Sequence, residues 1–496
     1  MSEETWHAAR LIPVSGISGS KEQEGRATSA LLAVLSSVRE FGRALTQPLG
    51  APAAPVQAFI EVPFSLGDKK FYPDGLLKVV RGRKTWTALV EVKTGSSELR
   101  TEQLENYLEV AREQGFDALI TISNEMPTMS GSHPTLIDKR KLRKVALHHW
   151  SWNHVLCEAV LQREHRGVVD ADQAWILGEL VRYLEHPRSG VMSFDDMGPA
   201  WVPVREAVMA GTLRPTDAIG EQVATRFGGL LQFAGLRLGR KVGGQVVPAL
   251  PRKHLADPSA HVQHQVARLA GSGRLSGRIR IPGAVGLLEV VADLRASQVI
   301  CHMDVEAPRE GRPVTRVKWL LRQLRRAPDS VRLEAFASHS RGPGNSELLR
   351  DVRVTPSLLV AGHRRELRSF RVAAIYPMGS KRGIGRNSFI DSVLTAVDSF
   401  HRDVVKELKA WSAPAPRKDN ATSGASEDPL AGSSMGTEDP REGCLQARAI
   451  DTAGSSISST AEQGAGAGHD VAQVPAQRCG PTPIPEAVDA EVAAAQ

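Results

Sequence analysis

Residues Phe71–Tyr107 read FYPDGLLKVVRGRKTWTALVEVKTGSSELRTEQLENY, and the N-terminal part of the chain is organised around them. Their pattern predicts a strand, a tight basic turn, a second strand and a helix. If residues 82–83 form a two-residue hairpin turn, the strand register places Asp74 opposite Glu91. The stretch therefore predicts two neighbouring carboxylates on an otherwise apolar hairpin.

The polar residues of the second strand share one face. Side chains alternate along a strand, so Glu91 and Lys93 project the same way, among Leu89, Val90 and Val92. Two carboxylates side by side repel each other unless a cation lies between them. This arrangement predicts a divalent-metal site. The alternative is an ion pair on the surface of the hairpin.

These residues resemble a known signature. Pro73-Asp74 followed by Glu91-Val92-Lys93 resembles the motif of the PD-(D/E)XK, or restriction-endonuclease-like, phosphodiesterases. Gln103 to Tyr107 resembles the Gln-x-x-x-Tyr element of the RecB-like branch of that superfamily. The match covers roughly residues 20–125, and the order and spacing of its parts carry more weight than any part alone.

The resemblance implies roles for the matching residues. Mg²⁺, or Mn²⁺ as a substitute, would be held by two carboxylates and one backbone carbonyl: Asp74, Glu91 and Val92. Lys93 would orient or deprotonate the attacking water, or stabilise the phosphate. Gln103 and Tyr107, four apart on one helix face, would order the substrate or the lysine.

A preceding helix is predicted from Lys21 to about Leu45, where apolar residues recur at three- and four-residue steps. In the family a glutamate on the first helix often completes the metal site. By resemblance that role passes to Glu24, which shares the apolar face, with Glu22 as second choice. The alternative is an acid in the first helical turn, stabilised by the helix dipole.

The remaining elements complete an αβββαβ order. A strand is predicted at Val56–Phe64, a helix at Ser97–Gln114 and a buried strand at Phe116–Ser123. Periodicity gives this order, and the resemblance implies the same order for an α/β nuclease core. The next segment is predicted to be mainly helical, and residues 240–378 have the composition of strands, interrupted by one helix.

At 496 residues the chain has room for two or three domains. The expected divisions are a lead-in (1–20), a nuclease-like α/β domain (21–152), a helical segment (153–238), an α+β domain of unknown role (239–412) and a tail (413–496). The tail has no aromatic residue, and it is predicted to be disordered and acidic.

The charge is uneven along the chain. The formal net charge is +7, yet the residues from Ala413 onward hold 5 Lys/Arg and 12 Asp/Glu, so the rest of the chain is strongly basic. A basic body favours a polyanionic partner such as nucleic acid. The 4 cysteines are far apart, and no secretory signal or membrane-spanning run is visible, so we expect a cytoplasmic protein that contacts no membrane.

Two basic segments are candidate nucleic-acid contacts. The run at 138–144 (DKRKLRK) offers Lys139, Arg140, Lys141, Arg143 and Lys144. A helix predicted at Arg312–Arg326 places Lys318, Arg322 and Arg325 along one face, opposite an apolar stripe. Solvated charge is the alternative for both segments.

Two features near these segments are expected to be structural. Trp150 and Trp152 are predicted to be core residues, with structural histidines beside them. Asp304 and Glu306 alternate along a strand without the family's lysine, and we expect them to face solvent.

Together these observations predict an Mg²⁺-dependent deoxyribonuclease, with DNA favoured over RNA and with defence and repair both compatible. Endonuclease and exonuclease action are not distinguished. The alternatives are a catalytically silent nucleic-acid-binding protein that keeps the fold, and a scaffold that binds a protein partner through its C-terminal half.

Overall fold

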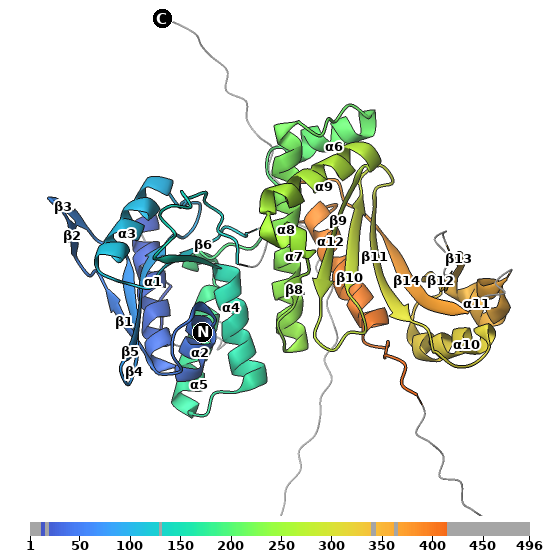
Figure 1. The fold of residues 1–496 in the computed structure, drawn as a ribbon, viewed down its shortest axis with the longest axis horizontal. Coiled ribbons are helices and arrows are strands. Elements are labelled where there is room, and N and C mark those ends of the chain that lie inside the picture. The colour runs from blue at the N-terminus through green and yellow to red at the C-terminus, as the bar shows by residue number, and fades with distance from the viewer. Residues whose placement is uncertain (1–10, 15–18, 128–130, 339–343, 362–365, 414–496) are drawn as a thin grey trace, which may run out of the picture. The chain divides into compact units, whose positions relative to one another are not determined.

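The computed structural model describes residues 11–14, 19–127, 131–338, 344–361 and 366–413 (Figure 1). Most of the expected lead-in, and all of the predicted tail except Ala413, lie outside these residues. Chain contacts divide the protein after Pro416, and every element described below precedes that point.

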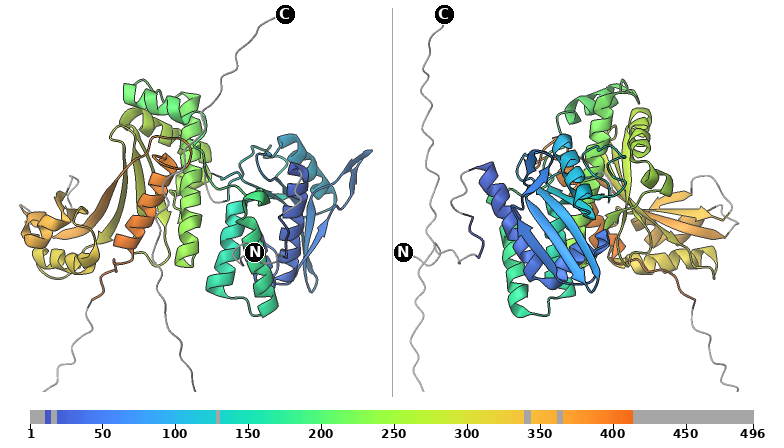
Figure 2. Two further views of the ribbon diagram at one scale, coloured as in Figure 1. Left: turned by 180° about the vertical axis from the view of Figure 1, so that it is seen from behind. Right: turned by 60° about the vertical axis from the view of Figure 1, so that its left-hand side comes forward.

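Five strands form the first sheet, in the order β1-β4-β5-β6-β7. The first three pair antiparallel, and β5, β6 and β7 pair parallel. Figure 2 shows this sheet from two further sides. Its strands are β1 (Val56–Ile60), β4 (Gly75–Arg81), β5 (Lys84–Val92), β6 (Ala118–Ser123) and β7 (Ala146–Ser151).

The central hairpin has the predicted register. Gly82 supplies the positive φ that a two-residue turn needs, at +60°. Gly75 pairs with Val90, so Asp74 and Glu91 occupy the next opposite positions, just before β4 and near the end of β5. The predicted turn and register are therefore confirmed.

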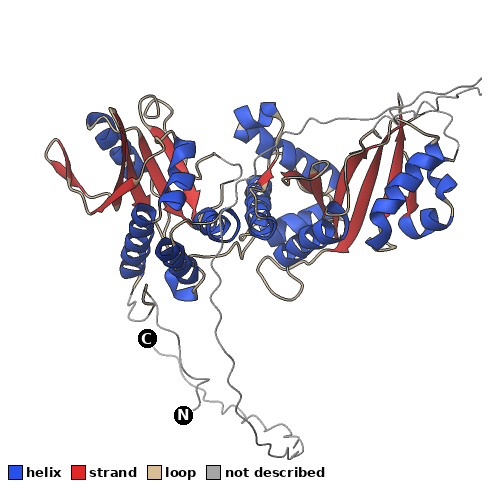
Figure 3. Cartoon of the chain, turned by 90° about the horizontal axis from the view of Figure 1, so that it is seen from below, coloured by secondary structure: helices blue, strands red, loops and turns tan. Residues whose placement is uncertain are grey.

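Helices cover both faces of this sheet (Figure 3). Residues such as Val90 and Val92 pack with one group of helices: α1 (Ser20–Ser37), α2 (Arg39–Thr46), α4 (Trp152–Val160) and α5 (Ala171–Leu184). Leu89 faces the opposite side and packs against α3 (Thr101–Glu113). Because strand residues alternate, Glu91 lies on the face that α3 covers.

The expected single helix over 21–45 is wrong in one respect, because Val38 separates α1 from α2. Val38 adopts an extended conformation, with φ −98° and ψ 97°. A Cβ at Gly42 would stand 2.4 Å from the Leu35 carbonyl oxygen, so α2 can fold this closely against the end of α1 only with glycine there.

Other boundaries also differ from expectation. The strand predicted over 56–64 ends at Ile60, and an unpredicted hairpin follows, formed by β2 (Phe64–Leu66) and β3 (Lys69–Phe71). The next strand consequently begins at Gly75. Helix α3 begins at Thr101 rather than Ser97, because residues 97–100 form a connection that buries Leu99.

The region predicted to be rich in strands forms a seven-stranded sheet in the order β13-β12-β14-β11-β10-β9-β8. The strands are β8 (Val247–Pro248), β9 (Arg274–Arg280), β10 (Leu288–Asp293), β11 (Gln298–Glu306), β12 (Arg332–Ala337), β13 (Asn345–Leu348) and β14 (Leu367–Pro377). The mixed α/β character expected from the sequence is confirmed.

A separate hydrophobic core surrounds this second sheet. The helices in this part of the chain are α6 (Trp201–Ala210), α7 (Ala218–Val242), α8 (Arg252–Ala256), α9 (Pro258–Ser272), α10 (Pro313–Gln323), α11 (Leu349–Val354) and α12 (Phe389–Phe400), and all of them except α8 contribute residues to this core. Within the described residues, no helix is both long and apolar enough to cross a membrane.

Candidate active site

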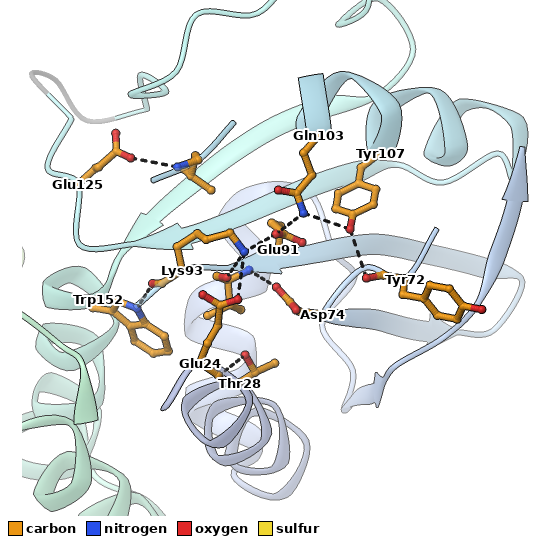
Figure 4. A network of polar contacts seen from close by, with 12 residues as sticks. Glu24, Thr28, Tyr72, Asp74, Glu91, Lys93, Gln103, Tyr107, Glu125 and Trp152 are labelled. Atoms are coloured by element: carbon orange, nitrogen blue, oxygen red, sulfur yellow. Dashed lines mark hydrogen bonds and ion pairs between the residues drawn. The ribbon is translucent and has the colours of Figure 1, made fainter. Parts of the chain in front are cut away.

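Six side chains predicted from the sequence converge beside the end of β5 (Figure 4). They come from one helix on each face of the sheet and from the two strands of the central hairpin. The six are Glu24 on α1, Asp74 before β4, Glu91 and Lys93 at the end of β5, and Gln103 and Tyr107 on α3.

Glu91 is the most enclosed of these groups, with only 1% of its surface exposed. Its Oε1 accepts hydrogen bonds from Lys93 Nζ at 2.6 Å and from Gln103 Nε2 at 2.7 Å. Its Oε2 is buried and has no hydrogen-bond partner. A buried carboxylate oxygen without a partner is costly, so this atom marks a place where a cation or a proton is expected.

Asp74 stands next to Glu91 and is fixed by the backbone. Its Oδ2 accepts the amide hydrogen of Val92 at 2.7 Å. Burial, and then the neighbouring Asp74 carboxylate, raise the pKa of Glu91 to about 8, although Lys93 opposes this shift. Near neutral pH, and without a bound cation, Glu91 therefore holds a proton.

Lys93 lies among the acids. Its Nζ is 3.1 Å from Glu24 Oε1, and it donates to the carbonyl of Val92 at 2.9 Å as well as to Glu91. Burial alone would lower the pKa of Lys93, but the nearby carboxylates, Glu91 foremost, raise it above its usual value. The side chain is therefore an ammonium ion at neutral pH.

Gln103 and Tyr107 form a chain of hydrogen bonds that starts on α3. Gln103 Nε2 also lies 3.3 Å from the Tyr107 hydroxyl, which in turn donates to the carbonyl of Tyr72 at 3.2 Å. Burial, and then the Glu91 carboxylate, raise the pKa of Tyr107 to about 12, so the phenol stays protonated. This chain of hydrogen bonds holds Glu91 in one orientation and connects it to the carbonyl of Tyr72, two residues before Asp74.

The structure separates the two candidate glutamates of α1. Glu24 contacts Lys93, whereas Glu22 pairs with Arg26 one turn along the same helix at 2.8 Å. The first choice therefore lies at the site and the second does not.

The oxygen donors at this site are of the kind that Mg²⁺ accepts. Among the described residues, no group of three or more His, Cys, Asp or Glu side chains is arranged to hold a metal ion. Asp74, Glu91 and the Val92 carbonyl offer two carboxylates and one carbonyl, and Glu91 Oε2 has no other partner. Mg²⁺ commonly keeps several waters and takes one or two carboxylates.

Trp152 is a site residue that the sequence did not indicate, although its predicted burial is confirmed at 0% exposure. Its indole Nε1 donates to the Lys93 carbonyl at 2.9 Å and so fixes the backbone beside the ammonium group. Nothing in the sequence ties a tryptophan to one distant carbonyl.

Trp152→Phe should lower the free energy of unfolding by about 1–3 kcal/mol, because it leaves a buried carbonyl without its donor. The backbone beside Lys93 would also loosen. Urea unfolding measures the change in stability. An unfolding midpoint equal to that of wild type would contradict this role.

A second polar network lies on β6 and β7. The Thr121 hydroxyl is 2.9 Å from His149 Nδ1 and 2.8 Å from His133 Nε2. His149 Nε2 faces the Glu125 carbonyl at 3.1 Å, and the Thr135 amide donates to His133 Nδ1 at 3.0 Å. These contacts are satisfied when both histidines are neutral with the proton on Nε2. His149 and His133 are thus held in a structural network, whereas Nε2 of His148 is buried without a hydrogen-bond partner.

This network predicts acid sensitivity. Burial lowers the pKa of His149 to about 3, whereas the unfolded side chain titrates near 6.5. Between these values only the unfolded chain takes up the proton, so stability should fall with decreasing pH by up to about 1.4 kcal/mol per unit. Above about pH 7 this contribution is constant.

Urea unfolding of wild type and His149→Asn between pH 7.5 and 5 tests this expectation. The slope of the unfolding free energy against pH should be smaller in the variant by up to about 1.4 kcal/mol per pH unit, which corresponds to one proton. Equal slopes would contradict the assignment.

The basic segments are on the surface. In the run at 138–144, Lys141 pairs with Glu105 of α3 at 3.2 Å, and the other four cations are exposed. On α10 and the turn after it, Lys318, Arg322 and Arg325 are exposed, and Val317, Leu320 and Leu324 are buried, as predicted. Asp304 and Glu306 are exposed, also as predicted, and Asp304 pairs with Arg371 at 2.7 Å. Whether either basic segment contacts nucleic acid stays a prediction.

No protein-family model matches this chain, and a search of curated proteins found no similar sequence. What the site can do therefore follows from its own geometry.

Proposed function

We propose that the N-terminal part of this chain is a metal-dependent nuclease that hydrolyses phosphodiester bonds in DNA. The observation that carries the proposal is the buried, unpartnered Oε2 of Glu91 beside Asp74, with an ammonium group at Oε1. An ordinary surface ion pair would be solvated and would leave no such atom buried.

The fold supports the same proposal. With helix α2 and the small hairpin β2–β3 set aside, α1, β1, β4, β5, α3 and β6 follow the αβββαβ order of the PD-(D/E)XK core. We propose that this part of the chain is such a core and that the six converging side chains correspond to its motif.

Asp74, Glu91 and the carbonyl of Val92 would hold Mg²⁺, or Mn²⁺ in its place. The ion would polarise a phosphate oxygen and acidify a bound water. The proton on Glu91 would have to leave when the ion binds, and Lys93 would have to give up its contact with the Val92 carbonyl.

Lys93 is suited to neutralising charge on the phosphate. Its raised pKa keeps the side chain protonated, so it is a poor general base and a good hydrogen-bond donor to a developing negative charge. Glu24 holds the ammonium group from the other side, and Gln103 keeps Glu91 turned toward it.

Assays on circular duplex DNA, linear duplex DNA and RNA test the proposed substrate and mode. Purified protein should degrade or nick DNA with Mg²⁺ or Mn²⁺ and do nothing with EDTA. Cleavage of the circle identifies an endonuclease. Salt-sensitive DNA binding without cleavage would favour the catalytically silent binding protein. If the protein neither binds nor cleaves DNA or RNA, the scaffold is favoured.

A further inference from the structure

The connection between β1 and β4 projects beside the candidate site. Ile60 pairs with Gly75, so the chain leaves the edge of the sheet and returns to the neighbouring strand fifteen residues later. We call residues 62–73 the arm. It contains the hairpin β2–β3, and Figure 1 shows it extending beyond the sheet near α3. Glu61, where the arm begins, has a φ of +53°, which turns the chain sharply.

The arm is packed against the helix that carries Gln103 and Tyr107. The rings of Phe71 and Tyr107 meet edge to face at 6.4 Å, and those of Phe64 and Phe116 at 5.7 Å. Phe64, Leu66 and Phe71 join the same hydrophobic cluster as α3. The base of the arm is therefore fixed relative to the catalytic side chains.

Exposed groups lie on both faces of the arm, because side chains alternate along β3: Lys70 shares one face with Tyr72, and Lys69 shares the other with Phe71. Lys69 and Lys70 are exposed, and neither has an ion-pair partner among the residues that the structure describes. Tyr72 is 58% exposed, while its carbonyl is held by the Tyr107 hydroxyl. In Figure 4 the Tyr72 ring points away from the carboxylates, two residues before Asp74. An exposed ring beside an active site is suited to stacking on a base.

The dimensions fit a bound strand. An extended chain rises about 3.3 Å per residue, so Lys70 stands at most about 13 Å along the chain from Asp74. One strand of a duplex rises about 3.4 Å per nucleotide. Lys70 thus reaches phosphates within about four nucleotides of the scissile phosphate, and Lys69 within about five.

We propose that the arm binds the nucleic-acid strand flanking the scissile phosphate, with Tyr72 stacked on a base and Lys69 and Lys70 on phosphates. This proposal rests on the proposed nuclease function. It adds the expectation that binding affinity depends on how far the substrate extends on one side of the scissile phosphate.

Fluorescence anisotropy with a 30-base-pair duplex, in Ca²⁺ to limit cleavage and at about 50–200 mM salt, tests the arm in the full chain. The Lys69→Ala, Lys70→Ala double variant should bind about tenfold more weakly and lower the salt slope by about two. Tyr72→Ala should weaken binding about tenfold, and Tyr72→Phe should bind like wild type.

The matched control is the Arg81→Ala, Lys84→Ala double variant, which removes two exposed cations at the other end of β4 and β5. It should bind within about twofold of wild type. A duplex that ends within two nucleotides of the cut on the arm's side should abolish the difference between the lysine variant and wild type.

The outcomes separate the two proposals. If wild type cleaves DNA and the arm variants bind like the control, the arm proposal is wrong and the nuclease proposal stands. If wild type neither binds nor cleaves nucleic acid, both are wrong. Weaker binding by the arm variants, with the control unchanged, supports the arm.

Discussion

Glu91→Gln should lower metal-dependent DNA cleavage by at least about a thousandfold while leaving the protein folded. The amide keeps the size of the carboxyl group and can still accept from Gln103 and Lys93 through Oε1. It replaces the oxygen that lacks a partner, Oε2, with a nitrogen that cannot bind a cation.

The same substitution should change stability little in EDTA. With its pKa raised to about 8, Glu91 is already mostly protonated at pH 7, so a neutral amide resembles the state it replaces. Thermal unfolding and plasmid cleavage measure the two effects. Glu22→Gln on α1 is the control and should cleave normally, since Glu22 pairs with Arg26 away from the site. A folded Glu91→Gln protein with more than a tenth of wild-type activity would contradict the assignment.

Lys93→Met should have two large effects. It leaves the buried Oε1 of Glu91 and the Glu24 carboxylate without their shared hydrogen-bond donor, so the free energy of unfolding should fall by about 1–3 kcal/mol in EDTA. Cleavage should fall by at least about a hundredfold, because the ammonium group would no longer neutralise charge that develops on the phosphate.

The two effects of Lys93→Met should respond differently to metal. A bound divalent ion would restore positive charge beside the carboxylates, so Mg²⁺ should raise the melting temperature of the variant more than that of wild type. It should not restore cleavage. Thermal unfolding with and without Mg²⁺ measures the shift, and an equal shift in both proteins would show that the ion binds elsewhere.

The placement of the central residues could be predicted from the sequence because it depends on local rules. Gly82 determines the turn, the turn sets the register, and strand alternation puts Glu91 and Lys93 on one face. The choice of Glu24 over Glu22 followed from helical spacing in the same way.

The remaining parts depend on contacts that are distant in sequence. Trp152 meets the Lys93 carbonyl across 59 residues, and His133 meets Thr121 only after the chain has folded back. The two short strands of the arm were missed because Phe64 and Phe71 also fit the ends of the longer strands predicted on either side of the turn, and only packing against α3 decides between the two arrangements. The same packing determines where α3 begins.

The most direct test of the account is single-turnover cleavage of a labelled duplex by wild type and Asp74→Asn, each with Mg²⁺ and with EDTA. Asparagine can still accept the Val92 amide hydrogen, so the backbone contact is retained while the carboxylate is lost. The account predicts cleavage by wild type with Mg²⁺ and by no other combination. Cleavage in EDTA, or equal cleavage by Asp74→Asn, would contradict it.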